Sequence, residues 1–136
     1  MAPCEKALIV DDSAGDRFLL ANALRENGVS EVDFVSSGEQ AVRYVSSLKI
    51  GSEPELIFID LIMEKMSGLD LLRWLRQNSV FDHIPVIILT SSRDEEQKAT
   101  AIALKAKAFF LKPMQLDELD AIVKKALAHC PQLQCA

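Results

Sequence analysis

The chain has 136 residues, of which 49% are hydrophobic and 26% charged, and its formal net charge is −5. This composition excludes a disordered chain, and the lack of a basic stripe argues against direct binding to nucleic acid. No apolar run approaches the roughly 20 residues of a membrane span, and residues 1–12 show no signal peptide. We therefore expect a cytoplasmic protein that forms a single domain over residues 1–136.

Five apolar, strand-like runs alternate with five amphipathic, helix-like segments. The predicted strands cover residues 6–11, 32–35, 55–60, 85–90 and 108–111. Helices are predicted to begin at or just after Ser13, Ser37, Ser67 and Ser92, since these hydroxyls can cap helices, and a fifth helix is predicted over residues 116–128. Continuous apolar strands that alternate with helices predict an α/β fold with a parallel sheet covered on both faces.

The second strand alternates polar and apolar residues, which predicts an edge position. The sequence shows no internal repeat and no interdomain linker. We expect a core over residues 6–128 and a short tail over residues 129–136, with no output domain attached.

Polar side chains follow the strands at the points where these end: Asp11-Asp12, Asp60, Thr90-Ser91 and Lys112. The carboxyl ends of parallel strands open onto one edge of a sheet, where ligands bind. These groups should therefore share one acidic pocket. Two carboxylates about 4 Å apart repel by about 4 kcal/mol at an effective dielectric near 20, so one is protonated or a cation neutralises them.

Oxygen ligands on loops suit Mg²⁺, with Mn²⁺ as an alternative. A carboxylate beside such an ion, Asp60, has the chemistry of a nucleophile that takes a phosphoryl group. Lys112 would supply a second cation, and the Thr90 hydroxyl could hydrogen-bond a phosphoryl oxygen.

Four ordered motifs carry a family resemblance: VDDS at residues 10–13, DLIMEKMSGLDLL at 60–72, ILTS at 88–91 and FFLKPM at 109–114. Together they resemble the receiver domain of two-component response regulators, in particular the stand-alone receivers of chemotaxis. The resemblance implies a flavodoxin-like, doubly wound (βα)5 fold with a five-stranded parallel sheet of order 2-1-3-4-5.

The resemblance also implies roles for the site residues. Asp60 would be the phosphoacceptor, and Asp11, Asp12, Asp60 and the backbone carbonyl of Ile62 would hold the metal ion. Thr90 and Lys112 would bind the phosphoryl oxygens. It further implies that Thr90 and Phe109 act as switch residues, and that the Lys112–Pro113 peptide bond is cis.

Such a protein takes a phosphoryl group from a histidine kinase or a phosphotransfer protein and changes the surface of its fourth helix, fifth strand and fifth helix. It is a regulatory phosphoacceptor whose only reactions are its own phosphoryl transfer and slow autodephosphorylation. Output would then pass to an effector protein in trans or through a homodimer. Phe110 would be either a docking residue on that surface or an aromatic packed under the last helix.

Three residues depart from the family pattern. Glu64 replaces the usual proline beyond the phosphoacceptor, and we hypothesise that its carboxylate alters metal affinity or the phosphoryl lifetime. Lys105 replaces the usual glycine at the end of the fourth helix, which leaves the boundary of that helix open. Phe109 replaces the commoner tyrosine, so a switch there would work by packing alone.

The three cysteines form no metal-binding pattern. An odd count without an export signal predicts reduced thiols. A Cys4–Cys130 disulfide is sterically conceivable in this fold, but the expected compartment argues against it.

Three alternatives remain at this point. A flavodoxin-like cofactor binder would need a hydroxyl- or glycine-rich phosphate loop where the chain has Asp11-Asp12. An aspartate-nucleophile phosphatase would carry a second acid two positions after the nucleophile, where the chain has Ile62. A degenerate receiver would act as an interaction module that needs no phosphorylation.

Overall fold

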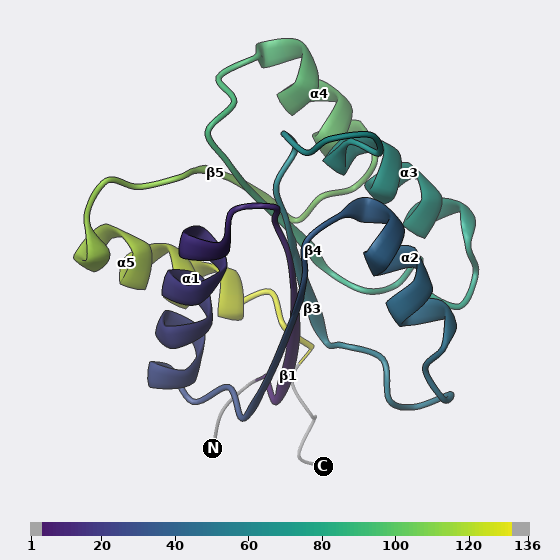
Figure 1. The fold of residues 1–136 in the computed structure, drawn as a ribbon, viewed down its shortest axis with the longest axis horizontal. Coiled ribbons are helices and arrows are strands. Elements are labelled where there is room, and N and C mark those ends of the chain that lie inside the picture. The colour runs from purple at the N-terminus through teal and green to yellow at the C-terminus, as the bar shows by residue number, and fades with distance from the viewer. Residues whose placement is uncertain (1–3, 132–136) are drawn as a thin grey trace.

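The computed structural model describes residues 4–131, in which strands and helices alternate along the chain (Figure 1). The strands are β1 (Lys6–Val10), β2 (Glu31–Val35), β3 (Leu56–Ile59), β4 (Val86–Thr90) and β5 (Ala108–Leu111). The helices are α1 (Ala14–Glu26), α2 (Gly38–Ser46), α3 (Gly68–Gln77), α4 (Glu95–Ala103) and α5 (Leu116–Leu127). No helix within this part of the chain is both long enough and apolar enough to cross a membrane.

The five strands form one parallel sheet in the order β2-β1-β3-β4-β5, which confirms the predicted fold class and strand order. The central strands β1, β3 and β4 are almost wholly buried, as expected for strands covered on both faces. The alternating strand β2 lies at one edge, as predicted, and β5 lies at the other. The strands therefore deliver their carboxyl ends to a common edge.

Helices cover both faces of the sheet (Figure 1). Helices α1 and α5 pack on one face, where residues such as Leu24 and Val123 meet Ile9 and Phe58. Helices α2, α3 and α4 cover the other face and bury a second apolar cluster around Ile57 and Ile88. Burial of these two apolar layers is the main force that holds the elements in place.

Serine hydroxyls cap three of the helices as predicted. Ser13, Ser37 and Ser67 each accept a hydrogen bond from the backbone N–H three residues later. The fourth helix differs, because Asp94 caps it in place of Ser92. The hydroxyl of Ser92 instead donates to Gln97 Oε1 at 2.5 Å, so the loop after β4 runs two residues further before the helix starts.

Helix α4 ends at Ala103, and Lys105 adopts a left-handed backbone conformation with φ of 67°. Glycine adopts this conformation most readily. Lys105 therefore takes the backbone conformation that glycine usually has at the end of a helix. The turn is held by Arg76, whose guanidinium donates to the carbonyls of Leu104 at 2.9 Å and Lys105 at 3.2 Å. Arg76 therefore satisfies carbonyl groups that the end of α4 leaves free.

Two predictions about covalent geometry are wrong. Cys4 and Cys130 form a disulfide, with Cα atoms 5.8 Å apart, so these two thiols are not free. Both cysteines are buried where α5 returns to the amino end of β1, and the fold itself brings them together. The Lys112–Pro113 bond, which was predicted to be cis, is trans, as is every other peptide bond within residues 4–131.

Candidate functional site

The phosphoacceptor candidate, Asp60, follows directly after β3 at the carboxyl edge of the sheet. Its backbone N–H donates to the carbonyl of Val10 at 3.0 Å, which continues the pairing of β3 with β1 and fixes the position of the side chain. Helix α3 starts so close to this point that a Cβ atom on Gly68 would collide with the carbonyl oxygen of Asp60. A glycine is therefore required there to let α3 pack against the site.

Three carboxylates converge at this edge. Asp11, Asp12 and Asp60 each offer an oxygen, and these oxygens all lie within 4.8 Å of one another. Asp11 and Asp60 are buried and Asp12 is exposed. Asp11 is held in place because its Oδ1 accepts the backbone N–H of Ser13 at 2.9 Å. The structure thus brings together the acidic residues that the sequence placed at two separate strand ends.

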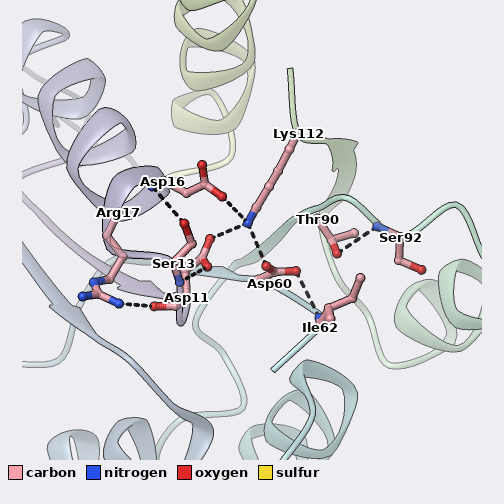
Figure 2. A network of polar contacts seen from close by, with 9 residues as sticks. All are labelled: Asp11, Ser13, Asp16, Arg17, Asp60, Ile62, Thr90, Ser92 and Lys112. Atoms are coloured by element: carbon pink, nitrogen blue, oxygen red, sulfur yellow. Dashed lines mark hydrogen bonds and ion pairs between the residues drawn. The ribbon is translucent and has the colours of Figure 1, made fainter. Parts of the chain in front are cut away.

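The ammonium group of Lys112 lies beside two of these carboxylates, those of Asp11 and Asp60 (Figure 2). Its Nζ is 2.8 Å from Asp60 Oδ2 and 2.9 Å from Asp11 Oδ2. A third carboxylate, Asp16 Oδ2, lies 2.7 Å away and comes from the first turn of α1. The sequence alone did not assign Asp16 to the site, although its place one helical turn after Asp11-Asp12 was a signal that its carboxylate could reach the same edge.

The site perturbs two of its ionisable groups. Burial raises the pKa of Asp11 above its ordinary value, against the opposing effects of the Ser13 N–H and of Lys112. Burial alone would lower the pKa of Lys112, but hydrogen bonds to Asp16, Asp60 and Asp11 outweigh it and raise that pKa above its usual range. Lys112 is therefore a permanent cation at neutral pH, enclosed by acids.

Thr90 and Ile62 lie beside this group without joining the ion pairs (Figure 2). Thr90 is fully buried, and its Oγ1 accepts the backbone N–H of Ser92 at 3.2 Å. Its carbonyl accepts the backbone N–H of Lys112 at 2.8 Å, which joins the ends of β4 and β5. The N–H of Ile62 donates to Asp60 Oδ1 at 3.1 Å. The carbonyl of Ile62 as a metal ligand stays a prediction.

The two aromatic residues of β5 face opposite layers. Phe109 is partly buried against the cluster of α2, α3 and α4, and Lys98 Nζ lies 5.7 Å from the centre of its ring. Phe110 packs against the cluster under α1 and α5. This packing agrees with the interpretation of Phe110 as an aromatic under the last helix, and a docking role for its partly exposed ring stays a prediction.

An open polar pocket of about 450 Å³ adjoins the site at Asp12, and Glu64 and Lys65 lie on its wall. Lys65 has φ of 62°, again the left-handed conformation, so the chain turns sharply just after Glu64. Glu64 thus lines the same open pocket as the exposed Asp12.

The donor set suits a hard divalent cation. Oxygen atoms are the only ligands that the three aspartates offer, and their clustering needs a positive charge to offset mutual repulsion. Asp12 faces solvent, which leaves room for water and a substrate oxygen on an ion bound there. The residues therefore fit Mg²⁺, or Mn²⁺ in its place.

The parallel sheet and this acidic edge define a flavodoxin-like α/β domain with a candidate site for a divalent cation, and comparison with known proteins identifies its family. The profile of the response regulator receiver domain matches residues 7–124. The chain therefore belongs to the response regulator receiver family, whose members are signalling phosphoacceptors of two-component systems and not enzymes in the ordinary sense.

Curated relatives include the two-component response regulator PhoP of Pseudomonas aeruginosa, 37% identical over 85% of this chain and 48% of that protein. Response regulator Rre1 of Synechocystis is 30% identical over 95% of this chain and 54% of that protein. The chain thus spans about half the length of these curated relatives.

Two solved structures have the same fold. The chain is similar to the phosphorylated cyanobacterial phytochrome response regulator RcpA, with a TM-score of 0.79 and 28% identity over 89% of this chain and 90% of that one. A response regulator receiver protein from Pseudomonas putida gives a TM-score of 0.76 and 30% identity, over 92% of this chain and 99% of that one.

Proposed function

We propose that Asp60 accepts a phosphoryl group from a phosphohistidine of a histidine kinase or phosphotransfer protein. The observation that carries this proposal is the convergence of the Asp11, Asp12 and Asp60 oxygens within 4.8 Å, beside a lysine that lies 2.8 Å from Asp60. The similar protein RcpA is known in a phosphorylated form, which supports phosphorylation of a site on this fold.

In the proposed reaction, a carboxylate oxygen of Asp60 attacks phosphorus. The new oxygen–phosphorus bond forms as the bond to the imidazole nitrogen of the donor breaks, and the imidazole leaves with the electron pair. Asp11, Asp12, Asp60 and the carbonyl of Ile62 would hold Mg²⁺, which when bound neutralises charge on the phosphoryl oxygens. Lys112, whose ammonium group lies 2.8 Å from Asp60 Oδ2, would bind the same oxygens.

The output step uses Thr90 and Phe109. The Thr90 hydroxyl leaves its bond with the Ser92 N–H and turns toward the phosphoryl group. This vacates space into which Phe109 can move, away from the Lys98 ammonium that now lies over its ring. A phosphoryl group adds about −1.5 to −2 charges, which is ample to bias such a loop. The face formed by α4, β5 and α5 then binds an effector protein or a second copy of the chain.

The test is intact-mass analysis after incubation with Mg²⁺ and acetyl phosphate. Wild type should gain one phosphoryl group, and Asp60→Asn should gain none. Asp117→Asn, which removes an exposed carboxylate at the start of α5, should keep the adduct. Absence of any adduct in wild type would instead favour a degenerate receiver that binds partners without phosphorylation. Omission of Mg²⁺ should also prevent the adduct.

A further inference from the structure

Asp16 is a fourth carboxylate at the site, and neither metal binding nor phosphoryl transfer uses it. Its oxygen is 2.7 Å from Lys112 Nζ, the shortest of the three contacts that this ammonium makes with carboxylates. Among the described residues, the cluster of possible metal ligands contains Asp11, Asp12 and Asp60 but not Asp16. Asp16 therefore acts at this site through Lys112.

The other two partners of Lys112 change during the proposed reaction. Asp11 would bind the metal ion. Asp60 would lose its negative charge when its oxygen becomes part of the acyl phosphate. Asp16 keeps its charge throughout. It is then the one carboxylate beside Lys112 that still competes with the phosphoryl oxygens for the same ammonium.

We propose that Asp16 is a positioning residue that holds Lys112 in competition with the phosphoryl group and so restrains phosphorylation of Asp60. This inference rests on the proposed function of Asp60. Asp16 also adds a partly exposed negative charge beside Lys112, which should repel an anionic phosphodonor. Its side chain is 44% exposed, so water and salt weaken both effects, and we expect a modest change of rate.

The test measures the rate of adduct formation on Asp60 in wild type and Asp16→Asn, with Mg²⁺ and acetyl phosphate. In this reaction the Asp60 oxygen–phosphorus bond forms and acetate leaves with the electrons of the bond that breaks. We expect Asp16→Asn to react about two- to fivefold faster, a factor in the range of a partly exposed ion pair. Asp16→Glu, which restores the carboxylate, should return the rate toward that of wild type.

Two further measurements separate competition for Lys112 from a structural role of Asp16 in the first turn of α1. The gain in Asp16→Asn should be larger with acetyl phosphate, a dianion near neutral pH, than with phosphoramidate, a monoanion. The dissociation constant of fluoroberyllate, which mimics the phosphoryl group at equilibrium, should fall by a factor similar to the rate gain. A purely structural role would lower the Tm and leave these quantities unchanged.

Asp117→Asn is the matched control, since it removes the same charge from an exposed site at the start of α5. An unchanged or slower rate in Asp16→Asn, or an equal gain in Asp117→Asn, would overturn the role of Asp16 and leave Asp60 as acceptor. A wild type that forms no adduct would contradict the assignment of Asp60 itself, and with it the competition.

Discussion

The Nζ atom of Lys112 lies 2.8 Å from Asp60 Oδ2, so the cation that we propose for the phosphoryl group already contacts the residue that we propose as its acceptor. Lys112→Met removes this cation and leaves the buried Asp11 and Asp60 facing each other. We expect the metal-free protein to lose about 1–3 kcal/mol of stability, the usual cost of losing hydrogen bonds to charged groups. Added Mg²⁺ should then raise the Tm more in Lys112→Met than in wild type.

Lys124→Met is the control for that experiment. Lys124 also forms an ion pair at 2.8 Å, with Asp120, but its side chain is 65% exposed. Its removal should change stability little, because water screens an exposed pair, and should leave the Mg²⁺ response unchanged. Equal effects of Mg²⁺ on the two variants would contradict the idea that Lys112 stands in for a metal ion.

Tyr44 provides a pH-dependent signal. Burial, together with the hydrogen bond that its hydroxyl donates to Asp33, raises the pKa of Tyr44 well above its usual value of 10.0. The folded state thus holds this proton more tightly than the unfolded state. The resulting stabilisation is complete below pH 10 and is lost as the pH rises through the folded-state pKa.

Tyr44 is the only tyrosine in the chain, so tyrosinate absorbance reports it alone. We expect no tyrosinate signal from folded protein at a pH of about 10, where a free tyrosine is half ionised. Asp33→Asn should move the midpoint down toward that value. A midpoint near 10 in the wild type would show that the Tyr44–Asp33 bond does not form in solution.

The disulfide should make a large contribution to stability. Cys4 and Cys130 are 126 residues apart in sequence, and a cross-link over such a distance restricts the unfolded chain strongly. The chain-entropy argument predicts a loss of up to about 5 kcal/mol on reduction. Denaturant unfolding with and without a reductant measures it. The double variant Cys4→Ser/Cys130→Ser should have the same free energy of unfolding as the reduced protein, and the reductant should not change it.

The left-handed turn at Lys105 predicts a stabilising substitution. Lys105→Gly removes the steric cost of φ at 67°, and we expect a gain of about 0.5–1 kcal/mol in the free energy of unfolding. The control is Lys107→Gly, close by in the chain but outside the left-handed region, where glycine should only add freedom to the unfolded state and destabilise. A loss in both variants would mean that Arg76, through its bonds to the Leu104 and Lys105 carbonyls, already offsets the strain.

Glu64 lines the same pocket as Asp12 and is exposed, so its carboxylate should attract a divalent ion only modestly. We expect Glu64→Gln to weaken Mg²⁺ binding by up to about fivefold. Glu64→Pro should weaken it equally if charge is the cause, and Glu26→Gln, at the far end of α1, should have no effect. Equal affinities in wild type and Glu64→Pro would remove the hypothesis.

Much of the fold was predictable because most strands and helices have clear signals in their own residues. Short apolar runs such as residues 56–59 indicate buried strands. Serine residues that cap helices indicate where three of the helices begin. The start of α4 was not predictable, since Ser92 and Asp94 are both good caps. The choice between them depends on Gln97, which engages the Ser92 hydroxyl through space.

The sequence predicted which residues form most of the site, but it did not predict the contacts that they make with one another. The five predicted residues lie at or just after the carboxyl ends of strands, which a parallel sheet brings to one edge. They are Asp11, Asp12, Asp60, Thr90 and Lys112. Asp16 escaped notice because it comes from a helix and meets Lys112 across 96 residues of sequence. The disulfide was predicted to be absent because a cytoplasmic protein was expected. That argument does not consider whether the fold brings the two sulfur atoms together.

The Cys4–Cys130 bond closes almost the whole domain into a covalent ring. A protease that cuts an oxidised molecule once, for example in the loop between α2 and β3, would open the ring without separating its two pieces. The nicked protein would keep both halves of its sheet, and with them the carboxylates of β1 and β3 on either side of the cut. Only after reduction would the same cut release two fragments, so the redox state decides whether a single nick destroys the domain.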